Sequence, residues 1–195
     1  MTRILCALYY GFARHLPPST FPSGHLWKAI RYQVCRSLFR SCGRNVNVES
    51  GARFGSGRQI TIGDNSGIGE NALIVGEVSI GRNVMMGPEV MIFARNHEFS
   101  NCERPMREQG NQLEQPVVIQ EDVWIGARAI LLPGISIGHG AVIGAASVVT
   151  SDVPAWAIVA GNPSRIIRFR KPRAATAEPP MTSCSFEVST ESERP

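Results

Sequence analysis

The stretch IQEDVWIGARAILLPGISIGHGAVIGAASVV, Ile119 to Val149, repeats one pattern every six residues. Each hexad begins with an aliphatic residue, and these anchors are Ile119, Ile125, Leu131, Ile137, Ile143 and Val149. A second small or aliphatic residue comes four positions after most of them, at Val123, Ala129, Ile135, Ala141 and Ser147. Neither an α-helix nor a flat strand has a period of six, so the pattern predicts a solenoid.

The same period extends towards the N-terminus. The earlier anchors are Ile62, Ile68, Ile74, Ile80, Met86 and Ile92, after a weaker prelude at Val48, Phe54 and Ile60. We expect a coil that turns a corner every six residues, with the anchors pointing inward and stacking on those of neighbouring coils. A series of β-hairpins is the alternative, but hairpin strands alternate with a period of two and favour Asn-Gly turns. The two series of anchors do not follow that pattern.

The rhythm breaks between the two series. Ile92 and Ile119 are 27 residues apart, which is not a multiple of six, and the stretch between them is charged and lacks inward aliphatic positions. This predicts a loop that leaves the coil at about residues 98–116, with His97 at its mouth. Extended loops on regular scaffolds usually carry function.

The segments on either side of the coil have other patterns. Residues 1–43 are predicted to be helical, because HLWKAIRYQVCRSLFR carries an apolar stripe at Leu26, Ile30, Val34 and Leu38. Arg31 falls off that stripe, and Gly43 is a candidate C-cap for the helix. The solenoid is expected over residues 44–171. Residues 172–195, rich in Pro, Ser, Thr, Ala and Glu, are expected to be a disordered tail.

The apolar run ILCALYYGF, Ile4 to Phe12, is too short to span a bilayer and lacks the cleavage site of a secretory signal. We expect a short helix that docks on the domain. The alternative is an interfacial anchor that makes peripheral membrane contact, helped by Arg31, Arg36 and Arg40.

Composition narrows the class of protein. With 43% hydrophobic and 18% charged residues, the chain of 195 residues is globular and can bury one core. The formal charge of +4 is mildly basic, and the aromatic residues do not interleave with the cations as a nucleic-acid surface would require. Five cysteines without close pairs indicate neither a disulfide framework nor a zinc site, so we expect a reducing, cytoplasmic location.

The hexads, the break with Asn96-His97, the VWIG at Val123 to Gly126 and the closing VVTSDVPAWAIVAGNPSRII resemble the hexapeptide-repeat acyltransferases. Within them the chain is most similar to the sugar O-acetyltransferases of the galactoside, maltose and colanic-acid or capsule type. The resemblance covers roughly Arg44 to Arg170. It implies an all-β fold, a left-handed parallel β-helix, and a homotrimer in which acetyl-CoA and a saccharide acceptor meet between neighbouring subunits.

The resemblance also implies a catalytic base. A sugar hydroxyl is a poor nucleophile at neutral pH, so a base must take its proton as it attacks the thioester of acetyl-CoA. His97 matches the family's catalytic histidine, and imidazole titrates near neutral pH. The other reading of His97 is a loop histidine held by a hydrogen bond.

The cofactor residues carried over from the family lie in the second series of hexads and after it. They are Trp124, Ala127, Ala145, Thr150, Ser151, Arg165 and Arg168. Small residues would let the pantetheine arm lie against the backbone, and arginine would pair with its phosphates. Ser151 stands where the galactoside and maltose enzymes have lysine, so we do not expect that cofactor contact here.

The family's acceptor-binding residues have poorer matches in this chain than its cofactor-binding residues. Where the family uses an asparagine and an aspartate on the early coils, this chain reads NSGIGENALIVGE, with glycines at or near both positions. Asn96, Glu108 and Gln109 in the loop are the candidates for acceptor contacts, each with the alternative that it is a plain surface residue.

Three other functions are the alternatives to O-acetyl transfer for a hexad coil with one histidine at its break. A γ-type carbonic anhydrase needs a zinc ion held by three histidines, and only His97 lies in the relevant part of the coil, so no metal is expected. A non-enzymatic scaffold would have no use for a histidine at the break. An N-acetyltransferase acting on an amino sugar or another amine would share the base and the cofactor groove.

Overall fold

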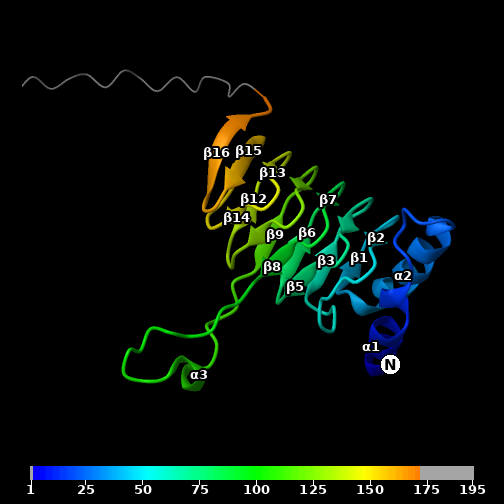
Figure 1. Cartoon of the computed structure of the whole chain (residues 1–195), viewed down its shortest axis with the longest axis horizontal. Helices are drawn as coiled ribbons and strands as arrows, with labels where there is room; N and C mark the ends of the chain where they lie inside the picture. Colours follow the sequence, from blue (N-terminus) through cyan, green and yellow to red (C-terminus); the bar gives the residue numbers. More distant parts are fainter. Residues whose placement is uncertain (1, 172–195) are drawn as a thin grey trace, which may run out of the picture.

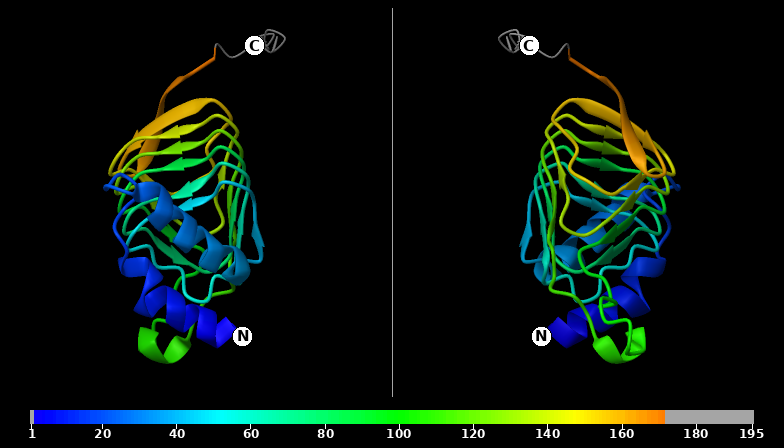
Figure 2. Two further views of the ribbon diagram at one scale, coloured as in Figure 1. Left: turned by 90° about the vertical axis from the view of Figure 1, so that its right-hand side faces the viewer. Right: turned by 90° about the vertical axis from the view of Figure 1, so that its left-hand side faces the viewer.

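The computed structural model describes residues 2–171 and shows a parallel β-solenoid with helices at one end and a β-hairpin at the other (Figure 1). Successive strands fall in turn on three sides of the coil, which we call faces A, B and C. Except for the last strand, which pairs antiparallel with its neighbour, each strand is hydrogen-bonded in parallel to the strand about one full turn away. Figure 2 shows the coils stacked on one another from two further directions.

Face A is one five-stranded sheet of β1 (Ser41–Cys42), β3 (Ile60–Ile62), β6 (Val78–Ile80), β9 (Val117–Ile119) and β12 (Ser136–Ile137). Face B begins with the pair β2 (Asn47–Val48) and β4 (Gly67–Ile68). It continues through β7 (Met85–Met86), β10 (Trp124–Ile125), β13 (Val142–Ile143), β15 (Ala157–Gly161) and β16 (Ser164–Phe169). Face C consists of β5 (Leu73–Val75), β8 (Met91–Phe93), β11 (Ile130–Leu131) and β14 (Val148–Val149).

The predicted anchors form the core. All twelve except Met86, which is half-buried, are buried, and so are the prelude residues Val48, Phe54 and Ile60. The small residues four positions later, such as Ala129, Ala141 and Ser147, are buried as well. The prediction of a solenoid with a six-residue period is therefore confirmed. One side chain of each hexad points into a shared column of aliphatic residues, and no single coil could bury it alone.

The corners between the faces need backbone with positive φ. At the corner between faces A and B of the first three coils this conformation is taken by asparagine, with φ of 55° at Asn45, 58° at Asn65 and 58° at Asn83. Asparagine tolerates the left-handed region better than other non-glycine residues. The amide of Asn45 donates to Asn65 at 3.0 Å, so these residues also tie one coil to the next.

The N-terminal segment covers the open end of the first coil (Figure 1). It consists of α1 (Thr2–Gly11), a 3₁₀ turn at Ala13–His15, and α2 (Gly24–Leu38). α1 docks through Tyr9, which is buried and whose hydroxyl donates to the carbonyl of Ala52 at 3.0 Å. Within residues 2–171 no helix combines the length and the apolar character needed to cross a bilayer.

Two details of α2 differ from the sequence-based prediction. The helix ends at Leu38 rather than near Gly43, because Arg40 already donates its backbone N–H to Ile60 and so joins the parallel ladder. Gly43 instead lies at a tight corner, where a Cβ atom would come within 2.5 Å of the backbone nitrogen of Asp64.

Arg31, predicted to lie off the apolar stripe, is completely buried. Its guanidinium donates to the carbonyls of Val48, Leu16 and Pro17 at 2.5, 3.1 and 2.8 Å and pairs with Glu49 at 3.3 Å. Leu26, predicted to be on the buried stripe, is instead 47% exposed. The helix therefore turns a charged side chain towards the first coil. Apolar spacing could not predict this, because carbonyl and carboxylate acceptors from two distant segments, Leu16–Pro17 and Val48–Glu49, compensate the charge.

Candidate active site

His97 lies where the chain leaves the solenoid after β8, at the corner between faces C and A. The two arms of the loop are hydrogen-bonded at this point. The N–H of Glu98 donates to Gly110 at 3.0 Å, and the N–H of Gln112 donates to Asn96 at 3.0 Å. His97 and Asn111 form an antiparallel bridge between these two bonds. The backbone of His97 is therefore held in place, while its side chain is exposed.

A pocket of about 430 Å³ opens beside the imidazole. It is lined by Val75, Phe93, Arg95, Asn96, His97 and Asn111. A second pocket of about 350 Å³ shares Val75 and Arg95 with it and extends over the corner from Phe54 to Gly57. The two form one groove that leads from the histidine towards α1. The hydroxyl of Tyr10 in α1 donates to Gly55 and accepts from the N–H of Phe54, each at 3.0 Å.

The loop holds its shape with its own polar groups. The amide of Gln109, at the end of the short helix α3 (Met106–Gln109), donates to the carbonyls of Asn101 and Arg104 at 2.7 Å each. The same amide accepts the N–H of Asn101 at 3.1 Å. The backbone N–H groups of Ser100 and Phe99 donate to the Glu98 carboxylate and hold its pKa below the usual range. Both side chains therefore stiffen the loop.

The other two predicted acceptor residues are open to solvent. Glu108 is exposed and has a weak ion pair with Arg107 at 3.8 Å. Asn96 is exposed and lines the pocket beside His97. Of the three loop candidates, Asn96 therefore lies in the pocket beside His97, while the amide of Gln109 is hydrogen-bonded within the loop.

The cofactor residues predicted in the second series begin on face B. The ring of Trp124 points outward and is half-exposed, and in the ladder of that face it lies between Met85 and Val142. Ala127 and Ala145 follow at the corner between faces B and C, where the coils are tightly stacked. A Cβ atom on Gly126 would come within 2.6 Å of the backbone nitrogen of Ala145. The residues predicted at this corner therefore have small side chains and lie beside one aromatic ring.

The remaining cofactor residues are divided between two places. Arg165 and Arg168 lie on β16, which extends face B through its antiparallel pairing with β15, and both are exposed. Thr150 and Ser151 follow β14, so they lie at the corner between faces C and A, on the same corner as His97 and two coils further along. The guanidinium of Arg165 donates to the carbonyl of Ser164 at 2.9 Å, and its other N–H groups can pair with phosphates.

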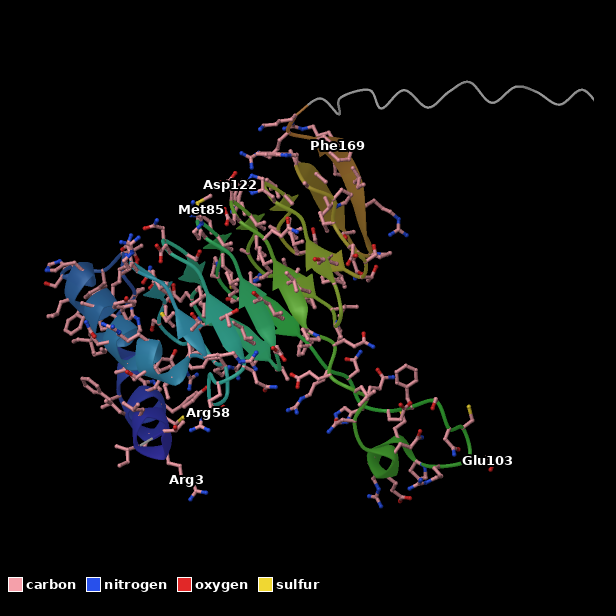
Figure 3. The ribbon with its side chains drawn as sticks, turned by 180° about the vertical axis from the view of Figure 1, so that it is seen from behind. Arg3, Arg58, Met85, Glu103, Asp122 and Phe169 are labelled. Carbon is pink, nitrogen blue, oxygen red and sulfur yellow. The ribbon has the colours of Figure 1, made fainter. Side chains whose placement is uncertain are left out.

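The predicted site residues therefore do not meet within one chain. In a three-sided coil the corner between faces C and A lies across the stack from face B, so His97 and Trp124 point in different directions. Figure 3 shows Met85 of face B and the loop residue Glu103 on opposite sides of the stack. A single subunit holds two half-sites, one with the histidine and one with the tryptophan.

One feature of face B is absent from the sequence-based prediction. Gly67 lies at an outward position of β4, between Asn47 and Met85, and forms part of a pocket of about 290 Å³. Its polar lining includes Lys28, Asn45, Asn47, Glu49 and Asn65. Neither φ nor packing demands glycine, because a Cβ atom would meet only the Asn47 carbonyl at an ordinary 3.5 Å. A glycine at an outward strand position was the signal that could have indicated this pocket.

Within the described residues 2–171, no group of three or more His, Cys, Asp or Glu side chains is placed to hold a metal ion. His139, which is half-buried, packs edge-on against Trp156 with ring centroids 4.7 Å apart. This histidine supports the last corner of the coil.

Comparison with known proteins gives one consistent answer. Residues 116–151 match the family described as bacterial transferase hexapeptide (six repeats). The galactoside O-acetyltransferase of Escherichia coli K12 is 36% identical over 140 residues, which cover 71% of this chain and 68% of that protein.

Solved structures agree with the sequence match. A maltose O-acetyltransferase from Clostridium difficile 630 superposes with a TM-score of 0.71 at 32% identity, covering 88% of this chain and 85% of the other. A hexapeptide-repeat-containing acetyltransferase of Vibrio cholerae, complexed with acetyl coenzyme A, superposes with a TM-score of 0.69 at 33% identity. That alignment covers 74% of this chain and 78% of the other.

Proposed function

The chain belongs to the hexapeptide-repeat acetyltransferases, and from this premise we propose that it transfers an acetyl group from acetyl-CoA to a hydroxyl of a saccharide. The observation that carries the proposal is the pocket at the break of the coil, where the exposed imidazole of His97 stands on a fixed backbone. We assign the enzyme to the biosynthesis of a surface polysaccharide or another glycan.

His97 is the general base in this proposal. Its free ring nitrogen takes the proton from the acceptor hydroxyl as the oxygen attacks the thioester carbonyl, and the proton then passes to the departing thiolate. The transfer forms one C–O bond and one S–H bond and breaks one C–S bond and one O–H bond. Asn96 and Asn111 line the same pocket and offer amide groups to the hydroxyls of the sugar. A backbone N–H is our choice for the donor to the oxyanion.

The residues of face B fit the cofactor. Acetyl-CoA supplies the activated acetyl group, a thin pantetheine arm and a set of anionic phosphates. The exposed ring of Trp124 and the backbone at Ala127 and Ala145 offer the flat surface that such an arm needs. Arg165 and Arg168 provide positive charge at the far end of this surface, and Thr150 and Ser151 complete the set from the other half-site.

The separation of the two half-sites supports a homotrimer with the active sites between subunits. Because His97 and Trp124 face away from each other, a complete site needs the histidine corner of one copy against face B of the next. That contact joins two different surfaces, so it is heterologous, and such contacts form a ring when the rotation between subunits closes. A trimer is the ring proposed here.

The pocket over Gly67 supports a role in acceptor binding. It adjoins Met85, the ladder neighbour of Trp124, so it continues the surface assigned to the cofactor. Amide, ammonium and carboxylate groups of Lys28, Asn45, Asn65 and Glu49 around an apolar floor suit a hydroxyl-rich ligand. Gly67→Val should fill the pocket and raise the KM for the acceptor several-fold, with the KM for acetyl-CoA unchanged. An unchanged KM for every active acceptor would remove this assignment.

We place the enzyme in the cytoplasm, at the inner face of the membrane. Acetyl-CoA is a cytoplasmic metabolite, and saccharide acceptors of surface polysaccharides are built on lipid carriers there. The free cysteines of the described residues, of which Cys102 is exposed, support a reducing compartment.

Calorimetric titration with acetyl-CoA tests the enzyme class without knowledge of the acceptor. We expect saturable binding at one site per subunit, and His97→Ala should bind equally well. Transfer is then measured on a panel of saccharides and amines, which separates O-acetyl from N-acetyl transfer. No binding at millimolar acetyl-CoA would contradict the proposal and favour a non-enzymatic scaffold.

Mixing two inactive variants tests the shared site. His97→Ala removes one half-site, and Trp124→Glu damages the other by removing the ring and repelling the anionic cofactor. When equal amounts are refolded together, about one quarter of the interfaces in a heterologous ring should pair two intact halves. Activity near that fraction supports the shared site, whereas no recovery from well-folded mixed oligomers would place both halves within one chain.

A further inference from the structure

α1 presents an apolar face to the outside of the molecule. Its other face packs on the first coil through Tyr9. The exposed residues of the helix and of the position that follows it are Arg3, Ile4, Ala7, Leu8, Gly11 and Phe12, which lie on one side of the helix. Ile4, Leu8 and Phe12 are 74%, 44% and 53% exposed. Among the described residues of α1, Arg3 is the only exposed polar side chain.

This arrangement is unusual for a helix in contact with water. A helix on the surface of a globular protein buries an apolar stripe and turns polar residues outward, and a helix that is apolar all round is normally buried. Contiguous exposed apolar patches mark surfaces that bind something. The outward face of α1 is therefore a docking surface, and its chemistry must identify the partner.

Charge identifies that partner. The first 48 residues contain no aspartate or glutamate and seven cations, namely Arg3, Arg14, Lys28, Arg31, Arg36, Arg40 and Arg44. The rest of the chain has 20 − 7 = 13 lysines and arginines against 16 acidic residues, a net charge of −3. Three of the seven cations pair with carboxylates beyond residue 48, namely Arg31 with Glu49, Arg40 with Glu77 and Arg44 with Asp64. The positive charge that remains on the segment that carries α1 is that of Arg3, Arg14, Lys28 and Arg36. An apolar strip with basic surroundings matches an anionic bilayer.

Two exposed cations border the apolar face directly. Arg3 is on α1 itself, and the guanidinium of Arg58 donates to the hydroxyl of Thr2 at the start of the helix. Figure 3 shows both arginines at the end of the molecule where α1 lies. Arginine pairs well with phosphate oxygens, which the lipid headgroups present at the surface of a bilayer.

We propose that the outward face of α1 binds anionic membranes, with Ile4, Leu8 and Phe12 entering the lipid interface while Arg3 and Arg58 contact the headgroup phosphates. The groove beside His97 leads towards this helix, and Tyr10 of α1 bonds to its floor at Gly55. A membrane-bound subunit would therefore hold the mouth of the groove near the bilayer. This last step rests on the proposed function, because it concerns a saccharide acceptor carried on lipid.

Co-sedimentation of the full chain with phosphatidylglycerol vesicles tests the surface without acetyl-CoA or acceptor. We expect the wild-type chain to bind these vesicles, to bind neutral phosphatidylcholine vesicles weakly, and to release as salt is raised. The double variant Ile4→Glu/Leu8→Glu should lose binding by about tenfold or more. The matched control is Ile166→Glu/Ile167→Glu, which adds the same charge to exposed apolar residues of β16, at the opposite end of the solenoid (Figure 1). It should bind like the wild type.

Two further measurements keep the result interpretable. Phe12→Trp retains an apolar side chain, and its fluorescence should be quenched by brominated phosphatidylglycerol if the face enters the bilayer. Sedimentation velocity compares the oligomeric state of the α1 variant with that of the wild type. The proposal is overturned if the wild type does not bind anionic vesicles or if Ile4→Glu/Leu8→Glu binds them equally well. It is also overturned if that variant loses subunits while the Phe12→Trp chain shows no quenching, because the face then joins copies of the chain.

Discussion

The coil from Val117 to Val149 and the loop of residues 95–116 are neighbours in sequence and opposites in construction. In the coil, an aliphatic side chain is buried at every sixth position, and backbone hydrogen bonds run to the coils on either side. In the loop no residue is buried, and the chain is held by side chains such as Gln109 and Glu98 that bond to nearby backbone groups. Stability therefore resides in one region and the candidate base in the other.

This difference explains why the candidate base lies at the break in the repeat. Every inward position of a coil is committed to packing, and its outward positions repeat along a straight face. A site needs side chains that converge, and only an interruption can place His97, Asn96 and Asn111 around one pocket. Substitutions should therefore separate into those that change activity and those that change stability.

The largest effect is expected at His97. Since the proposed base contributes to proton transfer, His97→Ala should lower kcat by about 10²- to 10⁴-fold. Because the side chain is exposed, the melting temperature should stay within about 1 °C of the wild type. Steady-state kinetics and differential scanning calorimetry measure the two quantities. A large loss of stability would show that the loop is not independent of the coil, and retained activity would remove His97 from the mechanism.

Leu131 should show the reverse behaviour. It is fully buried between the coils of β8 and β14, so Leu131→Ala leaves a cavity and should reduce the free energy of unfolding by about 2–5 kcal/mol. Leu113→Ala makes the same change at a loop position that is 90% exposed and should cost less than about 0.5 kcal/mol. Denaturant unfolding compares the two variants. Equal costs would break the distinction between coil and loop.

The coil could be predicted from the sequence because its physics is local and repeated. Each anchor needs only a neighbour six residues on and another one turn away, so the spacing alone indicates which side chains point inward. The loop could be predicted as an interruption for the same reason. Its internal bonds could not, because Gln109 contacts Asn101 and Arg104 through a fold that leaves no periodic trace.

The site was predicted as a list of residues and not as an arrangement. The sequence places His97 and Trp124 in consecutive coils, which suggests proximity, but the three-sided path puts them on different sides. The pocket over Gly67 was missed because its walls come from α2 and from three coils, through Lys28, Asn45 and Asn65. Arg31 was placed on the wrong side of its helix because its acceptors lie in other segments.

Glu49 lies where polar groups rather than apolar packing stabilise the solenoid, and its substitution measures their contribution. Burial raises the pKa of this carboxyl, but hydrogen bonds from Ser19 and Asn47 and the charge of Arg31 outweigh it, so the pKa lies below its usual range. Glu49→Gln should therefore lower stability at neutral pH by about 1–3 kcal/mol, as expected for a hydrogen bond to a charged group. Chemical denaturation at several pH values measures the difference.

The sign of the pH dependence follows from the lowered pKa. The ionised carboxylate stabilises the folded state fully above the unfolded-state pKa of about 4.3, and this contribution disappears as the pH falls through the lower folded-state pKa. The gap between wild type and Glu49→Gln should thus be constant near neutral pH and close below about pH 4. A gap that stayed open in acid would assign the effect to lost packing.

The smallest effect is expected at Gln109, where the loop is stiffened without being buried. Gln109→Ala removes three hydrogen bonds to the backbone of the loop, at Asn101 and Arg104. Because the groups left behind are exposed to water, the global free energy of unfolding should change by less than about 0.5 kcal/mol. Local opening should increase instead, so trypsin should cut after Arg107 several-fold faster. Leu113→Ala is the control, since it changes the loop without touching these bonds.

Unchanged cleavage would mean that the hydrogen-bonded neck at Asn96 and Gly110 is enough to order the loop. A lower melting temperature would mean that the loop and the coil unfold as one unit, and the contrast between the two regions would then hold for chemistry alone.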